Sequence, residues 1–168
     1  MNHILETTRL TLREMTIEDL DFISSMLAHP EVMQYYPKCY SREEAEAWIR
    51  RQIDRYRSHG HGLWLASEKE TREPVGQVGL APQLVDGVEE AEVGYLIHRR
   101  FWRRGLASEA AAAVRDYAFA VLCKRRVISL IRPENVPSQG VARKIGMKAE
   151  RQTIHAGLEH IVFALAKT

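Results

Sequence analysis

The chain has 168 residues, which suits one domain and is short for two, and its hydrophobic fraction of 45% is enough to build a core. The charged fraction is 27% and the net charge is +2, so the overall balance excludes a polycation that binds nucleic acid through bulk charge. The two cysteines, Cys39 and Cys123, are too few and too far apart in sequence for a metal knuckle, and they indicate reduced thiols.

The N-terminal segment predicts a strand and no targeting signal. The first ten residues, MNHILETTRL, lack the basic start and apolar core of a signal peptide, and no apolar run in the chain reaches the length of a membrane span. We therefore expect a cytoplasmic protein with no membrane partner. Within residues 7–15, Leu10 and Leu12 alternate with polar neighbours, which is the period of a half-buried strand.

Two helices are expected next in the chain. Residues 16–27, TIEDLDFISSML, place apolar side chains at helical spacing, and residues 41–56, SREEAEAWIRRQIDRY, do the same. Thr16 and Ser41 stand at the first position of each segment, and an acidic residue follows three positions later in both. This spacing is the pattern of a capping box, so it predicts where each helix begins.

The rest of the chain predicts strands interrupted by two more helices, with no repeat and no linker. The order of elements is β-α-α-β-β-β-α-β-α-β-β, which favours one mixed sheet of about seven strands with four helices on its faces, an α/β or α+β fold in a single domain, residues 1–168. The remaining expected elements are strands at 63–69, 74–82 and 89–98, a helix that ends near Leu122, a strand at 126–132, a short helix within 135–146, and strands at 147–154 and 158–166.

An unusual basic turn joins the strand at 89–98 to the following helix. The segment YLIHRRFWRRGLASEA holds four arginines within six residues, and Gly105 stands at the start of the helix. The first backbone N–H groups of a helix have no partner inside it, and the helix dipole adds partial positive charge there. Gly105 and the small Ala107 would let a phosphate approach these groups. The segment therefore predicts an anion site, and the alternative is a solvated basic turn.

Four segments taken together resemble a known family. They are TTRLTLREMTIEDL, GQVGL, AEVGYLIHRRFWRRGLASEA and NVPSQGVARKIGMK, and they run from Thr7 to about Met147. In this order they are similar to the GNAT superfamily of acyl-CoA-dependent N-acetyltransferases, and most similar to the branch that contains the ribosomal-protein N-terminal (RimJ/RimL-like) acetyltransferases. Four ordered motifs are far more specific than one glycine-containing turn.

The resemblance implies a GNAT-type sheet, mostly antiparallel, that splays at its central strands and holds acetyl-CoA there. The basic turn would wrap the pyrophosphate, so its positive charge would meet the phosphates of the coenzyme. Trp102 and Arg103 depart from the family's usual Gln or Arg followed by Gly, but the implied anion site depends mainly on backbone N–H groups. The implied coenzyme-binding residues are Leu96, Ile97, His98, Arg103, Arg104, Gly105, Leu106, Ala107, Ser108, Asn135, Ser138 and Arg143.

Acetyl transfer to an amine sets three chemical requirements, and the chain offers a candidate for each. The amine must be neutral to attack, and Glu92 is the candidate base, directly or through water, with a structural ion pair as its alternative role. The departing thiolate needs a proton donor, for which Ser138 is the candidate. Asn135 would bind the pantetheine amides, although both residues are also ordinary helix caps. The oxyanion would be met by a backbone N–H near Leu96 or Ile97.

Other polar and aromatic residues carry weaker hypotheses. Tyr35 and Tyr36 would line an acceptor cleft or simply pack, and His98 and His155 are minor candidates for the base because histidine titrates near neutral pH. The pair of histidines in HGHG has no third ligand nearby, so we expect no metal.

The leading functional hypothesis is an N-acetyltransferase that moves an acetyl group from acetyl-CoA to a primary amine by direct attack in a ternary complex. The acceptor would be a protein N-terminus or a small-molecule amine. The alternative is a module that binds acetyl-CoA without turnover. A nucleic-acid binder that uses the arginines is a third reading, which the near-neutral net charge disfavours. The resemblance also allows a homodimer, but no residue pattern predicts one.

Overall fold

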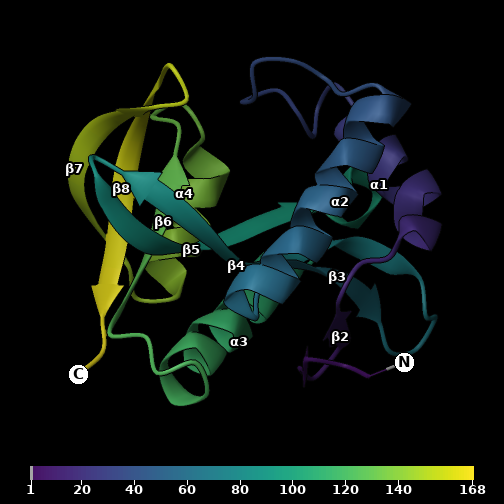
Figure 1. The fold of residues 1–168 in the computed structure, drawn as a ribbon, viewed down its shortest axis with the longest axis horizontal. Coiled ribbons are helices and arrows are strands. Elements are labelled where there is room, and N and C mark those ends of the chain that lie inside the picture. The colour runs from purple at the N-terminus through teal and green to yellow at the C-terminus, as the bar shows by residue number, and fades with distance from the viewer. Residues whose placement is uncertain (1) are drawn as a thin grey trace.

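A sheet of eight strands, in the order β1-β2-β3-β4-β5-β6-β8-β7, organises the molecule (Figure 1). The computed structural model describes residues 2–168. The strands are β1 (Leu5–Glu6), β2 (Leu10–Arg13), β3 (Leu63–Glu68), β4 (Pro74–Val85), β5 (Val88–Ile97), β6 (Arg126–Ile131), β7 (Lys148–His155) and β8 (Leu158–Ala166). The helices are α1 (Leu20–Leu27), α2 (Arg42–His59), α3 (Leu106–Ala120) and α4 (Val136–Lys144), with 3₁₀ turns at Ile17–Asp19 and Arg99–Phe101.

The predicted fold class is confirmed, with two local differences. The sheet has one strand more than the seven expected, because the two-residue β1 pairs with β2 and is too short to leave a periodic pattern. The first expected helix begins as a 3₁₀ turn before α1. Both capping boxes are formed, and the side chains of Thr16 and Ser41 accept backbone N–H groups as the spacing predicted.

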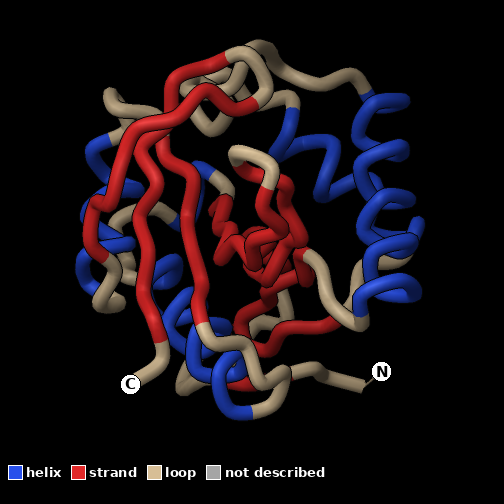
Figure 2. The backbone as a smooth tube through the Cα atoms, turned by 60° about the vertical axis from the view of Figure 1, so that its left-hand side comes forward, coloured by secondary structure: helices blue, strands red, loops and turns tan. Residues whose placement is uncertain are grey.

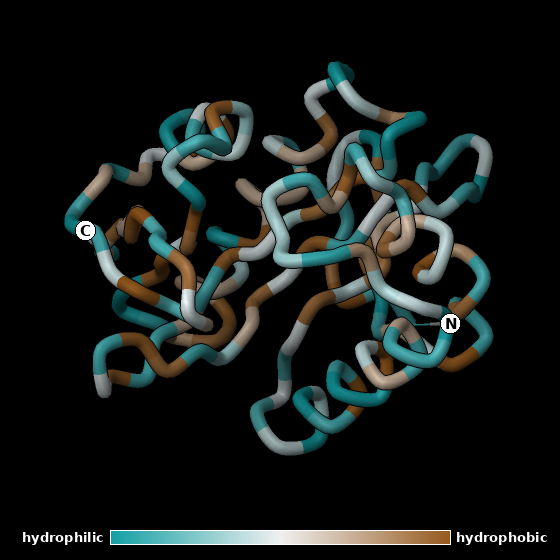
Figure 3. Tube along the Cα trace, turned by 90° about the horizontal axis from the view of Figure 1, so that it is seen from above, coloured by the Kyte–Doolittle hydropathy of each residue, from teal (hydrophilic) through white to brown (hydrophobic). Residues whose placement is uncertain are grey.

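The helices cover both faces of the sheet, which places hydrophobic clusters on each side (Figure 2). One cluster joins α3 and α4 to β4, β5 and β6, and a second joins α1 and α2 to the opposite face of β3, β4 and β5. Hydrophobic segments, brown in Figure 3, lie mainly inside, and the peripheral turns are mostly teal. Within residues 2–168, no helix is both long and apolar enough to cross a membrane.

The sheet opens between its two central strands. β4 and β5 share ten register pairs, whereas the parallel strands β5 and β6 share a single pair, Glu92 with Ile128. Beyond that pair the strands separate toward their carboxyl ends. The sheet thus divides into two halves, β1 to β5 and β6 to β8, with a gap between them.

The two halves are tied together at the end away from the gap. The hairpin of β4 and β5 turns at Asp86 and Gly87, whose φ angles of 50° and 79° are those of a two-residue type I′ turn. From this tip, Asp86 accepts hydrogen bonds from Thr153 at 2.6 Å and Arg151 at 3.0 Å, both on β7. Val85 packs in a small cluster with residues of β6 and β8. The sheet is therefore closed at the hairpin tip and open at the gap.

Small residues let α3 lie close to the sheet. Ala110 and Ala111 are fully buried against the central strands, so little volume separates the helix backbone from them. We expect Ala110→Leu to lower the free energy of unfolding by about 1–3 kcal/mol, because the larger side chain overpacks a filled interface. The matched variant Ala120→Leu, on an exposed position of the same helix, should change it by less than about 0.5 kcal/mol in denaturant titrations. Equal losses in both variants would contradict this packing.

Candidate active site

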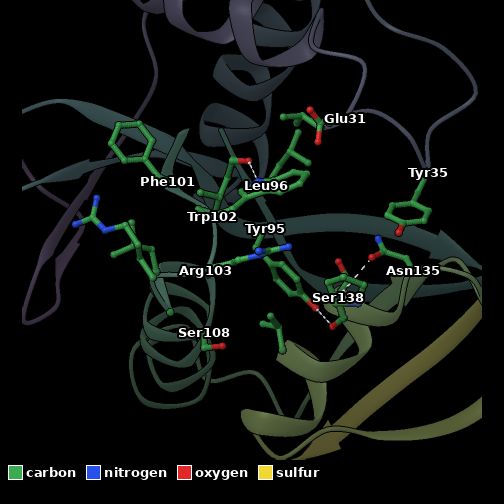
Figure 4. A pocket seen from close by; sticks show the side chains of 18 of the residues that line it. Glu31, Tyr35, Tyr95, Leu96, Phe101, Trp102, Arg103, Ser108, Asn135 and Ser138 are labelled. Atoms are coloured by element: carbon green, nitrogen blue, oxygen red, sulfur yellow. Dashed lines mark hydrogen bonds between the residues drawn. The ribbon is translucent and has the colours of Figure 1, made fainter. Parts of the chain in front are cut away.

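A cavity of about 430 Å³ lies at the opening between the two halves of the sheet (Figure 4). Four segments line it: the loop at 31–36 before α2, the end of β5, the turn that leads into α3, and the start of α4. A smaller cavity of about 70 Å³ adjoins it and is lined by Glu92. Tyr95, Asn135 and Ser138 line both, so the two cavities share a wall.

The start of α3 presents unpaired backbone N–H groups to this cavity. Arg103 and Gly105 have φ angles of 62° and 75°, a left-handed conformation that turns the chain sharply into the helix. The first intrahelical bond runs from the N–H of Glu109 to the carbonyl of Gly105, and no side chain caps the helix. The N–H groups of the three intervening residues, which all line the cavity, are therefore available to an anion.

The nearest acidic residue of α3 is held away from that end. The carboxylate of Glu109 accepts hydrogen bonds from the hydroxyl of Thr7 at 2.6 Å and from the backbone N–H and Nε of Arg9 at 2.8 and 2.7 Å. Arg9 also donates to the carbonyl of Arg104 at 2.9 Å. The first turn of α3 is thus bound to the turn between β1 and β2, and its only carboxylate is paired with a cation.

Most of the positive charge in the basic turn is neutralised by the protein itself. Among the described residues, Arg103 makes no ion pair and lines the cavity beside the start of α3. It is therefore the arginine of this turn whose charge is available to a ligand. The other three form the pairs Arg99 with Glu31 at 3.0 Å, Arg100 with Glu73 at 3.6 Å, and Arg104 with Glu68.

The hydrogen-bond register fixes which backbone groups of β5 face the gap. The N–H of His98 donates to the carbonyl of Val75 at 2.8 Å, so His98 and every second residue before it point toward β4. Tyr95 and Ile97 therefore turn their backbone groups toward the gap. The carbonyl of Ile97 accepts the indole N–H of Trp102 at 2.8 Å, which leaves its N–H free.

This register corrects the backbone contacts expected at two positions. The backbone groups of Leu96 face β4, the N–H of His98 donates to Val75 and its carbonyl accepts the N–H of Phe101, and His98 does not line the cavity. Leu96 contributes its side chain to the cavity wall. The coenzyme contact expected at Ile97 remains a prediction. Tyr95, which sequence reasoning did not select, offers both its N–H and its carbonyl to the gap, and its place in the alternation of β5 is the signal that could have found it.

The carboxylate of Glu92 is hydrogen-bonded within the protein. One oxygen accepts from the side-chain N–H of Gln83 at 2.9 Å, and the other accepts from the backbone N–H of Leu130 at 2.9 Å. Burial raises the pKa of Glu92, although these two hydrogen bonds oppose the shift. Among the described residues, Glu92 makes no ion pair. The structural role that was the alternative to a base therefore rests on hydrogen bonds from two uncharged groups. A raised pKa beside a cavity is typical of a general base.

The start of α4 combines capping with exposure to the cavity. The side-chain oxygen of Asn135 accepts the backbone N–H of Ser138 at 3.2 Å, as the capping alternative predicted. The hydroxyl of Tyr95 donates to the carbonyl of Ser138 at 2.7 Å and ties α4 to β5. The Ser138 hydroxyl and the Asn135 amide N–H₂ have no partner among residues 2–168. Capping therefore leaves both groups free for a ligand.

Other predicted residues lie at the margin of the cavity or outside it. Tyr35 and Tyr36 line it, as expected for an acceptor cleft, and Arg132 donates to the carbonyl of Tyr35 at 3.4 Å. Arg143 does not line it and stacks over the ring of a β8 phenylalanine at 5.3 Å. His155 also lies outside and packs edge-to-face on a neighbouring histidine.

Comparisons with known proteins agree with this architecture. The family model for the acetyltransferase (GNAT) domain matches residues 9–148. The Bacillus subtilis (strain 168) protein YkkB is 36% identical over 144 residues, which cover 85% of this chain and 84% of that protein.

Solved structures of acetyltransferases are similar to this chain over nearly its whole length. An acetyltransferase from Agrobacterium tumefaciens str. C58 superposes with a TM-score of 0.86 at 29% identity, covering 97% of this chain and 94% of that one. RimL, a ribosomal L7/L12 alpha-N-protein acetyltransferase solved in complex with coenzyme A, has a TM-score of 0.79 at 19% identity and covers 98% of both chains, which indicates a shared fold.

The hydroxyl of Tyr95 gives a direct test of how α4 is held. We expect Tyr95→Phe to lower the free energy of unfolding by about 1 kcal/mol, because the carbonyl of Ser138 loses its donor. Tyr117→Phe is the matched control, since this half-buried tyrosine of α3 has no hydroxyl partner among the described residues. Denaturant titration measures both, and a Tyr95→Phe variant as stable as the Tyr117→Phe variant would show that the bond contributes nothing.

Proposed function

Because the chain belongs to the GNAT acetyltransferase family, we propose that it moves an acetyl group from acetyl-CoA to a primary amine, either a protein N-terminus or a small molecule. The observation that supports this most is the pair of adjoining cavities at the gap in the sheet, the larger lined by the start of α3 and the smaller by the buried carboxylate of Glu92. We also assign the chain to the RimJ/RimL-like branch on its motifs. Both cysteines are unpaired and exposed, which suits the cytoplasm.

The described residues fit the phosphate and pantetheine portions of acetyl-CoA. The free N–H groups at the start of α3 suit the diphosphate, and the helix dipole and Arg103 add positive charge. The backbone groups of Tyr95 and Ile97 that face the gap would pair with the amides of the pantetheine arm, and so would the free side-chain N–H₂ of Asn135. Acetyl-CoA supplies the acetyl group as a reactive thioester.

The same residues meet the three chemical requirements of the transfer. Glu92 accepts the proton of the attacking amine, directly or through water, as the bond from nitrogen to the acetyl carbon forms. A free N–H on β5 at Tyr95 or Ile97 stabilises the oxyanion. As the bond from carbon to sulfur breaks, the hydroxyl of Ser138 donates a proton to the thiolate and regains one from solvent, to which Glu92 releases the proton that it accepted. Both substrates are bound together, so no acyl-enzyme is formed.

The proposal is tested by incubating the protein with acetyl-CoA and a panel of amines. The panel contains peptides with a free α-amino group, polyamines and lysine derivatives, so it separates the two classes of acceptor. Release of coenzyme thiol is followed with a thiol reagent, and mass spectrometry identifies the acetylated product. Turnover of any amine supports the enzyme. Tight calorimetric binding of coenzyme A without thiol release would favour the module that binds without turnover, and absence of binding would overturn both.

Arg103 and Arg100 form a matched pair for the phosphate contact. We expect Arg103→Ala to weaken coenzyme A binding about tenfold and to reduce its salt dependence, because an unpaired cation beside the helix start is lost. Arg100→Ala removes an exposed arginine that is paired with Glu73 and lies outside the cavity, so its dissociation constant should stay within about twofold of wild type. Isothermal titration calorimetry measures both. Equal effects would count against the site.

The role of Glu92 as the base predicts a defined pH dependence. The carboxylate must be ionised to accept a proton, so kcat should fall as the pH decreases through the raised pKa of Glu92. Glu92→Gln should lower kcat about a hundredfold or more and abolish this acidic limb. Coenzyme A affinity should stay within about threefold, since the phosphates bind elsewhere. A Glu92→Gln variant with wild-type kcat and pH profile would exclude Glu92 as the base.

A further inference from the structure

The separation of β5 and β6 leaves buried backbone groups without their ladder partners. In a parallel pair, the residues after Glu92 and Ile128 would continue to exchange N–H and carbonyl bonds. Here the strands part instead, and both run through the protein interior. A buried backbone group without a partner costs about 1–3 kcal/mol, so the gap needs other hydrogen-bonding groups at its closed end.

A buried serine supplies one of these groups. The hydroxyl of Ser129 on β6 donates to the carbonyl of Val93 on β5 at 2.7 Å. Ser129 is 2% exposed and Val93 is 1% exposed, so water has little access to either residue. Val93 stands next to Glu92, the last residue of β5 that pairs with β6. The Ser129 hydroxyl therefore takes the place of the backbone N–H of β6 that the carbonyl of Val93 would bond if the strands stayed paired.

A carboxylate supplies the second group from the other side. Glu92 accepts the backbone N–H of Leu130 on β6 at 2.9 Å, in place of a carbonyl of β5. Side chains alternate between faces along a strand, and Val93 lies in the cluster covered by α3. Glu92 therefore leaves β5 on the opposite face. Ser129 and Glu92 reach into the gap from the two faces of the sheet and connect the strands where the backbone no longer does.

We propose that Ser129 and Glu92 form a splay bridge, which fixes the point where β5 and β6 part and so sets the position of the free N–H groups of Tyr95 and Ile97. Ser129 is a positioning residue in this bridge. Ser129 lines the smaller cavity, but its hydroxyl donates to the carbonyl of Val93, and it acts through this carbonyl, two residues before Tyr95. This inference rests on the proposed acetyl transfer and adds a residue that controls its geometry.

The variant Ser129→Ala removes the hydroxyl and little else. The carbonyl of Val93 then has no donor on β6, so the end of β5 is free to shift relative to the thioester. The phosphates are held at the start of α3, on another wall of the cavity. We therefore expect coenzyme A affinity to stay within about threefold of wild type, and kcat to fall about tenfold with the shape of its pH profile unchanged. Thr153→Val, which removes a hydroxyl hydrogen bond on β7, controls for lost stability.

A spectroscopic signal tests the positioning without knowledge of the acceptor. The probe is acetyl-CoA labelled with ¹³C at the thioester carbonyl, whose chemical shift reports its hydrogen bonding on the protein. We expect a displaced carbonyl signal in Ser129→Ala and an unchanged one in Thr153→Val. If the wild-type protein did not bind the probe, the proposed function itself would be wrong. Normal binding with identical signals and equal kcat in wild type and Ser129→Ala would overturn the inference alone.

The wild-type protein gives an independent check if Ser129→Ala fails to fold. In ¹⁵N-labelled protein, the amide signal of Leu130 should shift with pH in a single step that matches the titration of the Glu92 carboxyl, because the two groups are hydrogen-bonded. A Leu130 amide that does not follow this carboxyl would show that the bridge is not made. The ionisable groups near Glu92 that this titration must be separated from are Arg55 of α2, Tyr36 of the 31–36 loop, Tyr95 of β5 and His155 of β7.

Discussion

The parting of two parallel strands after one register pair is the constraint on which the rest of the molecule depends. Every other neighbouring pair of strands is antiparallel and shares two or more register positions, and β5 and β6 alone combine parallel pairing with a single contact. The parting frees backbone groups of β5, makes room for a cavity in the middle of the sheet, and brings α3 and α4 to its edges. The buried carboxylate of Glu92 then lies within the sheet and still lines a cavity.

The charges of the basic turn beside the gap are mostly paired within the protein. The basic turn looks like a reservoir of positive charge, yet carboxylates from three other segments hold Arg99, Arg100 and Arg104 in place. These pairs neutralise three of the four arginines of the turn. In the proposed site, the attraction for an anion comes mainly from oriented backbone N–H groups, which carry no mobile side chain and lose little entropy on binding. Arg103 adds charge at one point. Backbone N–H groups therefore contribute more to the proposed site than side-chain charge does.

The parts of this structure that could be read from the sequence are those set by local spacing. Thr16 and Ser41 marked helix starts because a cap and its partner are three residues apart. Gly105 marked the start of α3 and the predicted anion site because a glycine there would let a phosphate approach the backbone, and the structure adds that its φ is left-handed. The resemblance to known acetyltransferases supplied the splay, which no local pattern encodes. Glu92 meets Leu130 across 38 residues of chain, and Glu109 meets Arg9 across 100. Such contacts appear only once the strands are assembled, as does the register that turns Tyr95 to the gap.

The main cavity takes its walls from elements on both faces of the sheet. Tyr35 and Tyr36 belong to the segment between α1 and α2, whereas Ser108 and Ser138 belong to α3 and α4. In the proposed transfer, an acceptor that entered beside the two tyrosines would meet a donor held at the start of α3 without displacing it. An acceptor attached to something as large as a folded protein would then have to insert only its terminal residues.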